Sequence, residues 1–118
     1  MKMAATENPR ETVLAFVKAL NEEDFDRART YVNDDLSFEG VLGSRQGAEA
    51  YFQDMTRMRL KYDVKKVFSD STDVCIFNDV TMSGAKILVA SWYHVDQGKI
   101  RSLRVVFDPR PLLATKAA

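Results

Sequence analysis

The segment KILVASWYHVDQGKIRSLRVVFD, residues 86 to 108, decides the fold of this chain. Two runs of alternating side chains flank a turn signal at residues 96 to 98, which predicts a β-hairpin. Because neighbouring residues of a strand point to opposite faces, the odd positions from Ile87 to Val95 share one face and the even positions share the other. Both faces carry apolar side chains, so each needs its own cover. We expect one face to line a core or pocket and the other to pack against a second subunit.

The composition describes a short chain without a charge bias. Its 118 residues include 17 Lys and Arg and 17 Asp and Glu, which gives a formal net charge of 0. This balance argues against the basic surface of a nucleic-acid or anionic-membrane binder, so we expect neither partner. Cys75 is the only cysteine. An internal disulfide is therefore excluded, and a cytoplasmic location with an inert, buried thiol is expected.

The pattern predicts helices first and strands afterwards. Asn8, Pro9 and Glu11 match the N-cap and first turn of a helix that runs to about Asn21. The next expected elements are a helix at residues 24–32, a strand at 36–41, a turn at 43–47, a helix at 46–58, and antiparallel strands at 61–68, 72–82, 86–95 and 99–108. The chain is thus expected to form one α+β domain, 1–118, with frayed tails at about 1–7 and 114–118.

Several segments carry a family resemblance through their order and spacing. They are the helix from Pro9 to Leu20, NEEDFDRA at 21–28, YVNDDLSF at 31–38, the helix start at 43–52, and GKIRSLRVVFD at 98–108. Together they resemble the nuclear transport factor 2-like superfamily, most closely its SnoaL-like and ketosteroid-isomerase-like branch. The resemblance implies a cone-like, curved antiparallel sheet with three helices of the N-terminal half over its concave face. It also implies an apolar pocket and, commonly, a homodimer formed through the outer sheet face.

The resemblance does not carry over the standard ketosteroid isomerase site. That site uses an aspartate base, a tyrosine and a protonated aspartic acid. The matching positions in this chain are Gly40, Phe16 and Ser91, and Glu39, beside Gly40, faces the other way in a regular strand. The standard site is therefore expected to be absent, and the sequence leaves open whether the chain is an enzyme.

The pocket lining follows from the same alignment, which makes Ser91 an inward residue. The expected lining residues are Phe16, Leu20, Phe38, Gly40, Phe52, Met55, Met58, Val89, Ser91, Leu103, Val105 and Phe107. A mostly apolar set of this kind is typical of a small-molecule site. It describes a filled core equally well, and the sequence does not separate the two.

Three residues are candidates for acid-base chemistry. Asp79 is a candidate general base if it faces an apolar cavity, although it alternatively marks a bulge or faces solvent at the sheet rim. Tyr31 and Tyr93 are candidate donors to a ligand oxygen, although each is alternatively a structural residue with a satisfied hydroxyl. No metal is expected, because one His and one Cys offer no ligand spacing. No organic cofactor is expected, because the chain has neither a P-loop nor a dinucleotide-binding glycine pattern.

Three further expectations concern residues outside the pocket: a set of charged side chains, two leucines near the C-terminus and the dimer interface. In the limonene epoxide hydrolase branch of the resemblance an Asp-Arg-Asp arrangement activates water, and Asp79, Arg104 and Asp108 invite the comparison even though Arg104 falls on the outer face. Leu112 and Leu113 follow the strand-stopping prolines and are expected to fold back over the pocket mouth or the dimer seam. The expected dimer interface comprises Leu88, Ala90, Trp92, His94 and Arg104.

Two functional hypotheses remain. The first is a SnoaL-like protein that binds a small, mostly apolar organic molecule in the cone, with or without isomerase-, cyclase- or hydrolase-type acid-base chemistry. The second is a non-catalytic ligand carrier or protein-interaction dimerisation domain. A hollow cone with an inward Asp79 favours the first hypothesis, whereas a cone filled by aromatic rings favours the second.

Overall fold

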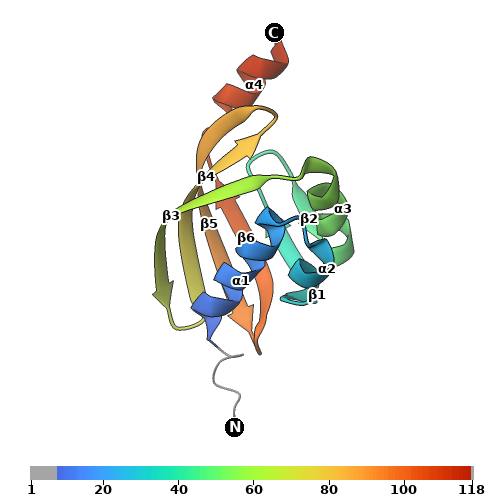
Figure 1. Cartoon of the computed structure of the whole chain (residues 1–118), viewed down its shortest axis with the longest axis vertical. Helices are drawn as coiled ribbons and strands as arrows, with labels where there is room; N and C mark the ends of the chain where they lie inside the picture. Colours follow the sequence, from blue (N-terminus) through green and yellow to red (C-terminus); the bar gives the residue numbers. More distant parts are fainter. Residues whose placement is uncertain (1–7, 118) are drawn as a thin grey trace.

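A curved, six-stranded sheet with helices on its inner side makes up residues 8 to 117, the part of the chain that the computed structural model describes (Figure 1). Side chains are described for residues 8 to 113. The elements are α1 (Pro9–Asn21), α2 (Phe25–Arg29), β1 (Val32–Glu39), β2 (Ser44–Gln46), α3 (Ala48–Met58), β3 (Lys61–Asp70), β4 (Asp73–Met82), β5 (Ala85–Asp96), β6 (Lys99–Val106) and α4 (Arg110–Ala117). The strand order is β2-β1-β6-β5-β4-β3. The α+β layout, with α1 to α3 in the N-terminal half of the chain, is confirmed.

Strand β1 makes the sheet mixed rather than wholly antiparallel. It runs parallel to β6, with Val32 opposite Ile100, and the Ile100 amide donates to the Tyr31 carbonyl at 2.8 Å. The helix expected over residues 24–32 is shorter in the structure, because the chain pairs with β6 from Val32 onward. Residues 44–46 were expected to be a turn, but they form β2 by pairing with the end of β1. The first error arises from pairing with a strand distant in the sequence, which overrides local preference. The second arises from a tight local hairpin, in which the Gly40 amide donates to the Gly43 carbonyl and the turn is shorter than expected.

Helix α1 is capped and clamped by two asparagines. Asn8 Oδ1 accepts from the Glu11 amide at 3.3 Å, as its N-cap position predicts. At the other end, the Asn21 side chain donates to the Tyr62 carbonyl at 2.8 Å and accepts from the Tyr62 amide at 2.7 Å. These two bonds fix the end of α1 to β3, so its apolar stripe of Val13, Phe16 and Leu20 is held against the sheet.

Strand β5 shows the predicted alternation. Its odd residues from Ile87 to Val95 are buried on the inner face, whereas Leu88 and Trp92 on the outer face are 57% and 49% exposed. The hairpin to β6 turns at Gln97 and Gly98, both with positive φ, which suits the right-handed twist of the two strands. The predicted hairpin and the predicted inner face are confirmed.

The inner side of the sheet holds two apolar clusters. The main core lies beneath α1 and α3, and a second cluster of Val80, Ile87, Val89 and Leu112 lies at the other end of β4 and β5. Leu112 belongs to α4, whose helix extends to Ala117 into the expected C-terminal tail, and the expectation that this tail is frayed stays a prediction. Residues 1–7 and 118, the rest of the expected tails, lie outside the described residues. Leu113 stays 51% exposed.

The clamp at Asn21 gives a stability prediction. Asn21→Ala removes both bonds to Tyr62 and leaves backbone groups of β3 partly buried and unpaired, so the free energy of unfolding should fall by about 1–3 kcal/mol. Urea unfolding monitored by circular dichroism measures the change. Asn33→Ala is the matched control, because Asn33 makes only a local bond, to the Asp35 amide. An equal decrease in the free energy of unfolding in the two variants would show that the two bonds from Asn21 to Tyr62 add no more stability than the local bond of Asn33.

Candidate functional site

The inner face of the sheet gathers most of the expected pocket residues, most of them in the main core under α1 and α3, and Val89 and Phe107 at the second cluster. Phe16, Leu20, Phe52, Met55, Val89, Ser91 and Leu103 are buried there, and Phe38, Gly40, Val105 and Phe107 are half-buried. Met58 is the exception at 46% exposure, because α3 ends with it and the chain turns away through a left-handed Arg59. Its assignment to the interior was wrong. That the remaining residues line a ligand pocket stays a prediction.

Aromatic rings fill the middle of this interior. The Phe16 ring makes edge contacts with Phe52 and Tyr93 at centroid distances of 6.4 and 6.1 Å. Tyr51 packs against Phe52 in the same way at 5.3 Å. Edge-to-face arrangements at these separations are favourable, so the rings stabilise one another as well as the core. The helix-covered part of the cone is therefore a packed core.

Asn78 is the polar side chain that the sequence analysis missed on this face. It is fully buried, and its Nδ2 donates to the Val89 carbonyl of β5 at 2.9 Å. Its Oδ1 is buried and has no hydrogen-bond partner among the described residues. Asn78 alternates in phase with Ile76 and Val80, both buried, and that phase was the signal available in the sequence.

Asp79, the candidate base, lies on the opposite face. It pairs in register with the exposed Leu88, and its carboxylate lies 3.7 Å from Lys65 Nζ. The condition for Asp79 to act as a base, that it faces an apolar cavity, is not met, because β4 alternates regularly there and its buried neighbours Asn78 and Val80 point inward. The alternative of an outward-facing acid describes its position.

The Asp-Arg-Asp set suggested by the epoxide hydrolase comparison is not brought together. Arg104 lies on the outer face, where its Nε is 2.8 Å from a Glu39 carboxylate oxygen and its guanidinium stacks over Trp92. Asp108 is paired with Arg110 beyond the end of β6. Each charged group is thus neutralised by a different partner at the surface.

Tyrosine hydroxyls supply further polar groups in the interior. Burial raises the pKa of Tyr51, Tyr62 and Tyr93, and a hydrogen bond with Ser91 acts in the opposite direction on Tyr93. The three phenols lie close enough to interact electrostatically. Tyr31 differs: it is half-buried, and a hydrogen bond with its hydroxyl raises the pKa of the Arg27 guanidinium. Of the two tyrosine candidates, only Tyr93 is on the inner face of the sheet.

The charge state of the interior follows from this inventory. Among residues 8 to 113, the buried polar side chains are Thr12, Asn78 and Ser91, together with the buried tyrosines Tyr51 and Tyr93. None of the Asp, Glu, Lys, Arg or His side chains in this range is buried. The interior can therefore donate and accept hydrogen bonds, but it holds no buried ionic acid or base.

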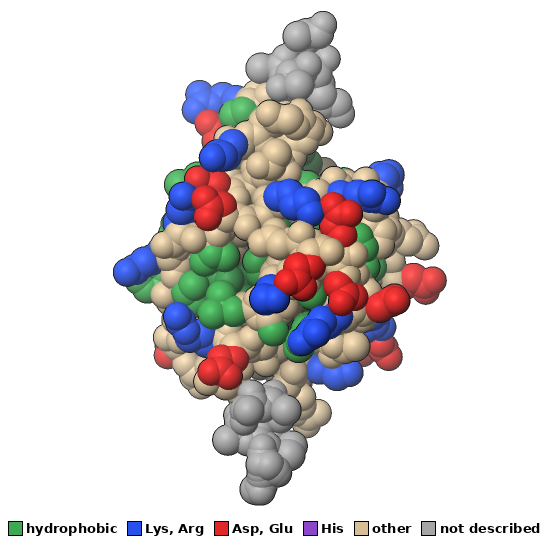
Figure 2. Space-filling view, viewed as in Figure 1, with side chains coloured by type: hydrophobic (Ala, Val, Ile, Leu, Met, Phe, Trp, Pro, Cys, Tyr) green, Lys and Arg blue, Asp and Glu red, His purple; other side chains and the backbone are tan. Residues whose placement is uncertain are grey.

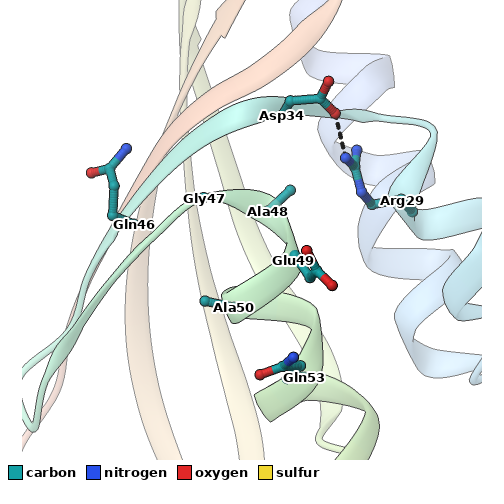
Figure 3. Close-up of a pocket in the computed structure, with 8 residues that line it drawn as sticks. All are labelled: Arg29, Asp34, Gln46, Gly47, Ala48, Glu49, Ala50 and Gln53. Carbon is teal, nitrogen blue, oxygen red and sulfur yellow. Dashed lines mark hydrogen bonds and ion pairs between the residues drawn. The ribbon is translucent and has the colours of Figure 1, made fainter.

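A separate surface hollow of about 600 Å³ lies outside the cone. Figure 3 shows Arg29 and Asp34 on one wall and the first turns of α3, with Glu49 and Gln53, on the other. Arg29 is already occupied, because it pairs with Asp34 and donates to the Val32 carbonyl. With its one cation paired and an acidic Glu49 at the helix start, this open hollow offers no anion-binding site.

The helical side of the molecule carries both signs of charge. Figure 2 shows acidic and basic side chains interspersed over this side, with a hydrophobic patch over the strands beside α1. Within the described residues no three His, Cys, Asp or Glu side chains come together to hold a metal ion. No helix in this part of the chain is long and apolar enough to cross a membrane.

The outer sheet face presents a broad apolar surface. Besides the expected Leu88 and Trp92, it exposes Phe68, Phe77 and Val106. Phe68 and Phe77 pack edge to face at 6.1 Å. Beside this surface, the Asp73 carboxylate accepts from Trp92 Nε1 at 3.2 Å and lies 3.0 Å from His94 Nδ1. These contacts lower the pKa of Asp73. The five exposed side chains, Phe68, Phe77, Leu88, Trp92 and Val106, are called the outer apolar patch below.

Comparison with known proteins assigns the family. Residues 13–103 match the model of the SnoaL-like domain. The chain belongs to the SnoaL-like family. This SnoaL-like chain has no match among curated proteins.

Solved structures place this SnoaL-like protein among nuclear transport factor 2-like folds. An NTF2-like protein of unknown function from Cytophaga hutchinsonii is 43% identical with a TM-score of 0.88, covering 90% of this chain and 95% of that one. An LEH-like epoxide hydrolase from M. tuberculosis is 26% identical with a TM-score of 0.74, covering 97% and 98%. A putative ketosteroid isomerase from Kribbella flavida shares the fold at 12% identity, with a TM-score of 0.78 and coverages of 85% and 77%.

The buried Tyr51 and Tyr93 and the half-buried Tyr62 give a pH prediction. Their pKa values are raised above the ordinary value of 10, so their contribution to stability is complete below pH 10 and is lost as the pH rises toward the folded-state values. We expect the absorbance change of these phenolates at 295 nm to coincide with the loss of the far-ultraviolet dichroism signal. Tyr93→Phe should weaken the pH dependence of unfolding above pH 10. Full ionisation of all four tyrosines near pH 10 in a folded protein would contradict the buried placement.

Proposed function

We propose that this SnoaL-like protein is a non-catalytic binding protein, or carrier, for a small, neutral, mostly apolar organic molecule, and that it acts as a homodimer. The observation that carries the proposal is the composition of the inner sheet face. It combines apolar walls with the neutral polar groups of Asn78, Ser91 and Tyr93, and no Asp, Glu, Lys, Arg or His side chain is buried among residues 8 to 113. A charged ligand would leave its charge unpaired there, at a large cost.

The same composition argues against acid-base catalysis. A general base has to reach the proton that it abstracts, within about 3 Å or through one water molecule. The three positions that match the isomerase site are Phe16, Gly40 and Ser91, and none of them ionises near neutral pH. Asp79 lies on the outer face beside Lys65. The phenols of Tyr51 and Tyr93 are protonated at neutral pH, and burial raises their pKa values further, so they are suited to donate to a ligand oxygen rather than to accept its proton.

The outer apolar patch supports the dimer. Its five side chains come from four adjacent strands and are 38–62% exposed. Contiguous exposed patches of this kind mark interaction sites, whereas single exposed apolar residues do not. Arg104 and Glu39 add charges of both signs beside the patch. A surface with both signs is complementary to a second copy of itself across a two-fold axis, so we assign the patch to self-association.

A reducing compartment fits the single thiol. Cys75 is half-buried on the outer face, and burial raises its pKa, so it stays a protonated, weakly reactive thiol near neutral pH. We therefore propose the cytoplasm as the location.

Ligand binding is tested by a thermal-shift screen of neutral and charged organic fragments. Neutral, mostly apolar fragments should raise the unfolding temperature, and at about 100 times Kd a ligand adds roughly 2.7 kcal/mol of stability. Fragments that carry a carboxylate or an ammonium group serve as matched controls and should have no effect. Mass spectrometry of each hit after prolonged incubation should show unchanged compound. If no fragment raises the unfolding temperature, the proposed binding function is contradicted. If a bound fragment is chemically converted, the non-catalytic assignment is contradicted.

The dimer is tested with two charge insertions at similarly exposed sites. Trp92→Glu places a carboxylate within the outer apolar patch and should halve the mass measured by light scattering. Leu113→Glu changes a leucine of α4 with 51% exposure, against 49% for Trp92, and should leave the mass unchanged. A wild-type monomer, or a Trp92→Glu variant that remains a dimer, would show that the patch has another role.

A further inference from the structure

We propose that the ligand site of this protein is centred on Asn78, that it selects molecules carrying a hydrogen-bond donor, and that the molecule enters beneath α4. This inference rests on the proposed binding function and specifies its chemistry. It names the acceptor, the ligand group that the acceptor requires, and the part of the chain that covers the site.

The orphaned oxygen of Asn78 defines the ligand chemistry. The Val89 carbonyl can only accept, so the amide nitrogen of Asn78 must face it, and Oδ1 points away from that carbonyl. A fully buried amide oxygen without a partner is uncommon in folded proteins and calls for an explanation. A bound molecule with a hydroxyl or an N–H group would satisfy this oxygen, whereas a purely acceptor-bearing molecule would not.

The position of Asn78 places this oxygen where the packing changes. Along β4 it lies between Ile76 of the main core and Val80 of the second cluster. Leu60, Tyr62 and Val105 are half-buried and contact both clusters, so they mark the seam between them. The seam is lined by apolar side chains and by the phenol of Tyr62, which suits an apolar molecule with one polar group.

Helix α4 contributes one leucine to the cover of the second cluster, which borders the seam. Leu112 packs on Val80, Ile87 and Val89 and is 9% exposed, whereas its neighbour Leu113 faces outward at 51%. Figure 1 shows α4 extending from the end of the sheet, away from α1 and α3. The main core is closed by packed rings, so the second cluster is the side of Asn78 with the lighter cover. A path there requires Leu112 and half-buried side chains packed beside it to move, whereas α1 and α3 stay in place.

Indole and benzofuran form a matched pair of probes. They have nearly the same shape and apolar area, but only indole carries an N–H donor. The full-length protein is titrated with each probe, and Kd is measured from amide chemical shifts by two-dimensional NMR. We expect shifts at the Asn78 side-chain amide and at Leu112, and about tenfold tighter binding of indole, the size of effect that one buried hydrogen bond supplies.

Three variants complete the test. Asn78→Leu should reduce indole affinity to the benzofuran level while benzofuran still binds, which shows in the same experiment that the site is folded. Leu112→Ala should strengthen the binding of both probes at least threefold by removing the cover, and Leu113→Ala should leave both affinities unchanged.

The outcomes separate this inference from the proposed function. Equal affinities for the two probes, or shifts confined to other parts of the cone, would leave a binding protein but overturn the role of Asn78. Identical behaviour of Leu112→Ala and Leu113→Ala would overturn entry beneath α4. No shifts with either probe at millimolar concentration would overturn this inference, and the proposed function would fall with it if the fragment screen is also flat.

Discussion

Strand β5 has apolar side chains on both faces, and the arrangement of the molecule depends on how each face is covered. The inner face is covered from within the chain by α1, α3 and Leu112 of α4. The outer face keeps Leu88 and Trp92 exposed. Because the side-chain period of a strand is two, a slip of one residue would exchange the faces and expose the core. Register in this sheet therefore decides which residues are covered by the helices of the chain and which stay exposed on the outer face.

Covering the inner face with helices leaves a neutral interior. Ionised groups are excluded because burial without a partner is costly, so the polar groups there are amides and hydroxyls. The SnoaL-like family shares its fold with proteins named as isomerases, cyclases and epoxide hydrolases. In this chain the acids and bases of the sheet lie on its outer face or rim instead. Asp79 beside Lys65 and Arg104 beside Glu39 are examples.

The two apolar clusters differ in how extensively they are packed. The main core is interlocked by Phe16, Phe52 and Tyr93 and tied to β3 through Asn21. The second cluster has one helical residue, Leu112, as its cover. A region with fewer packed contacts opens at a lower free-energy cost than a region with many. Asn78, at the seam, has a buried amide oxygen without a hydrogen-bond partner among the described residues and lies next to that more easily opened side.

The sequence by itself determined the hairpin, the inward set on β5 and the capped first helix, because periodicity and capping are local properties. The tertiary structure alone decided the start of β1 at Val32, which requires pairing with Ile100, and the cover supplied by Leu112. The tertiary structure also decided which of the neighbours Asn78 and Asp79 is buried on the inner face. Alternation assigns them to opposite faces, but only the strand register shows that Asn78 is buried beside Val89 and Asp79 is paired with Lys65. Side-chain partners across strands depend on long-range pairing, which one strand's pattern does not encode.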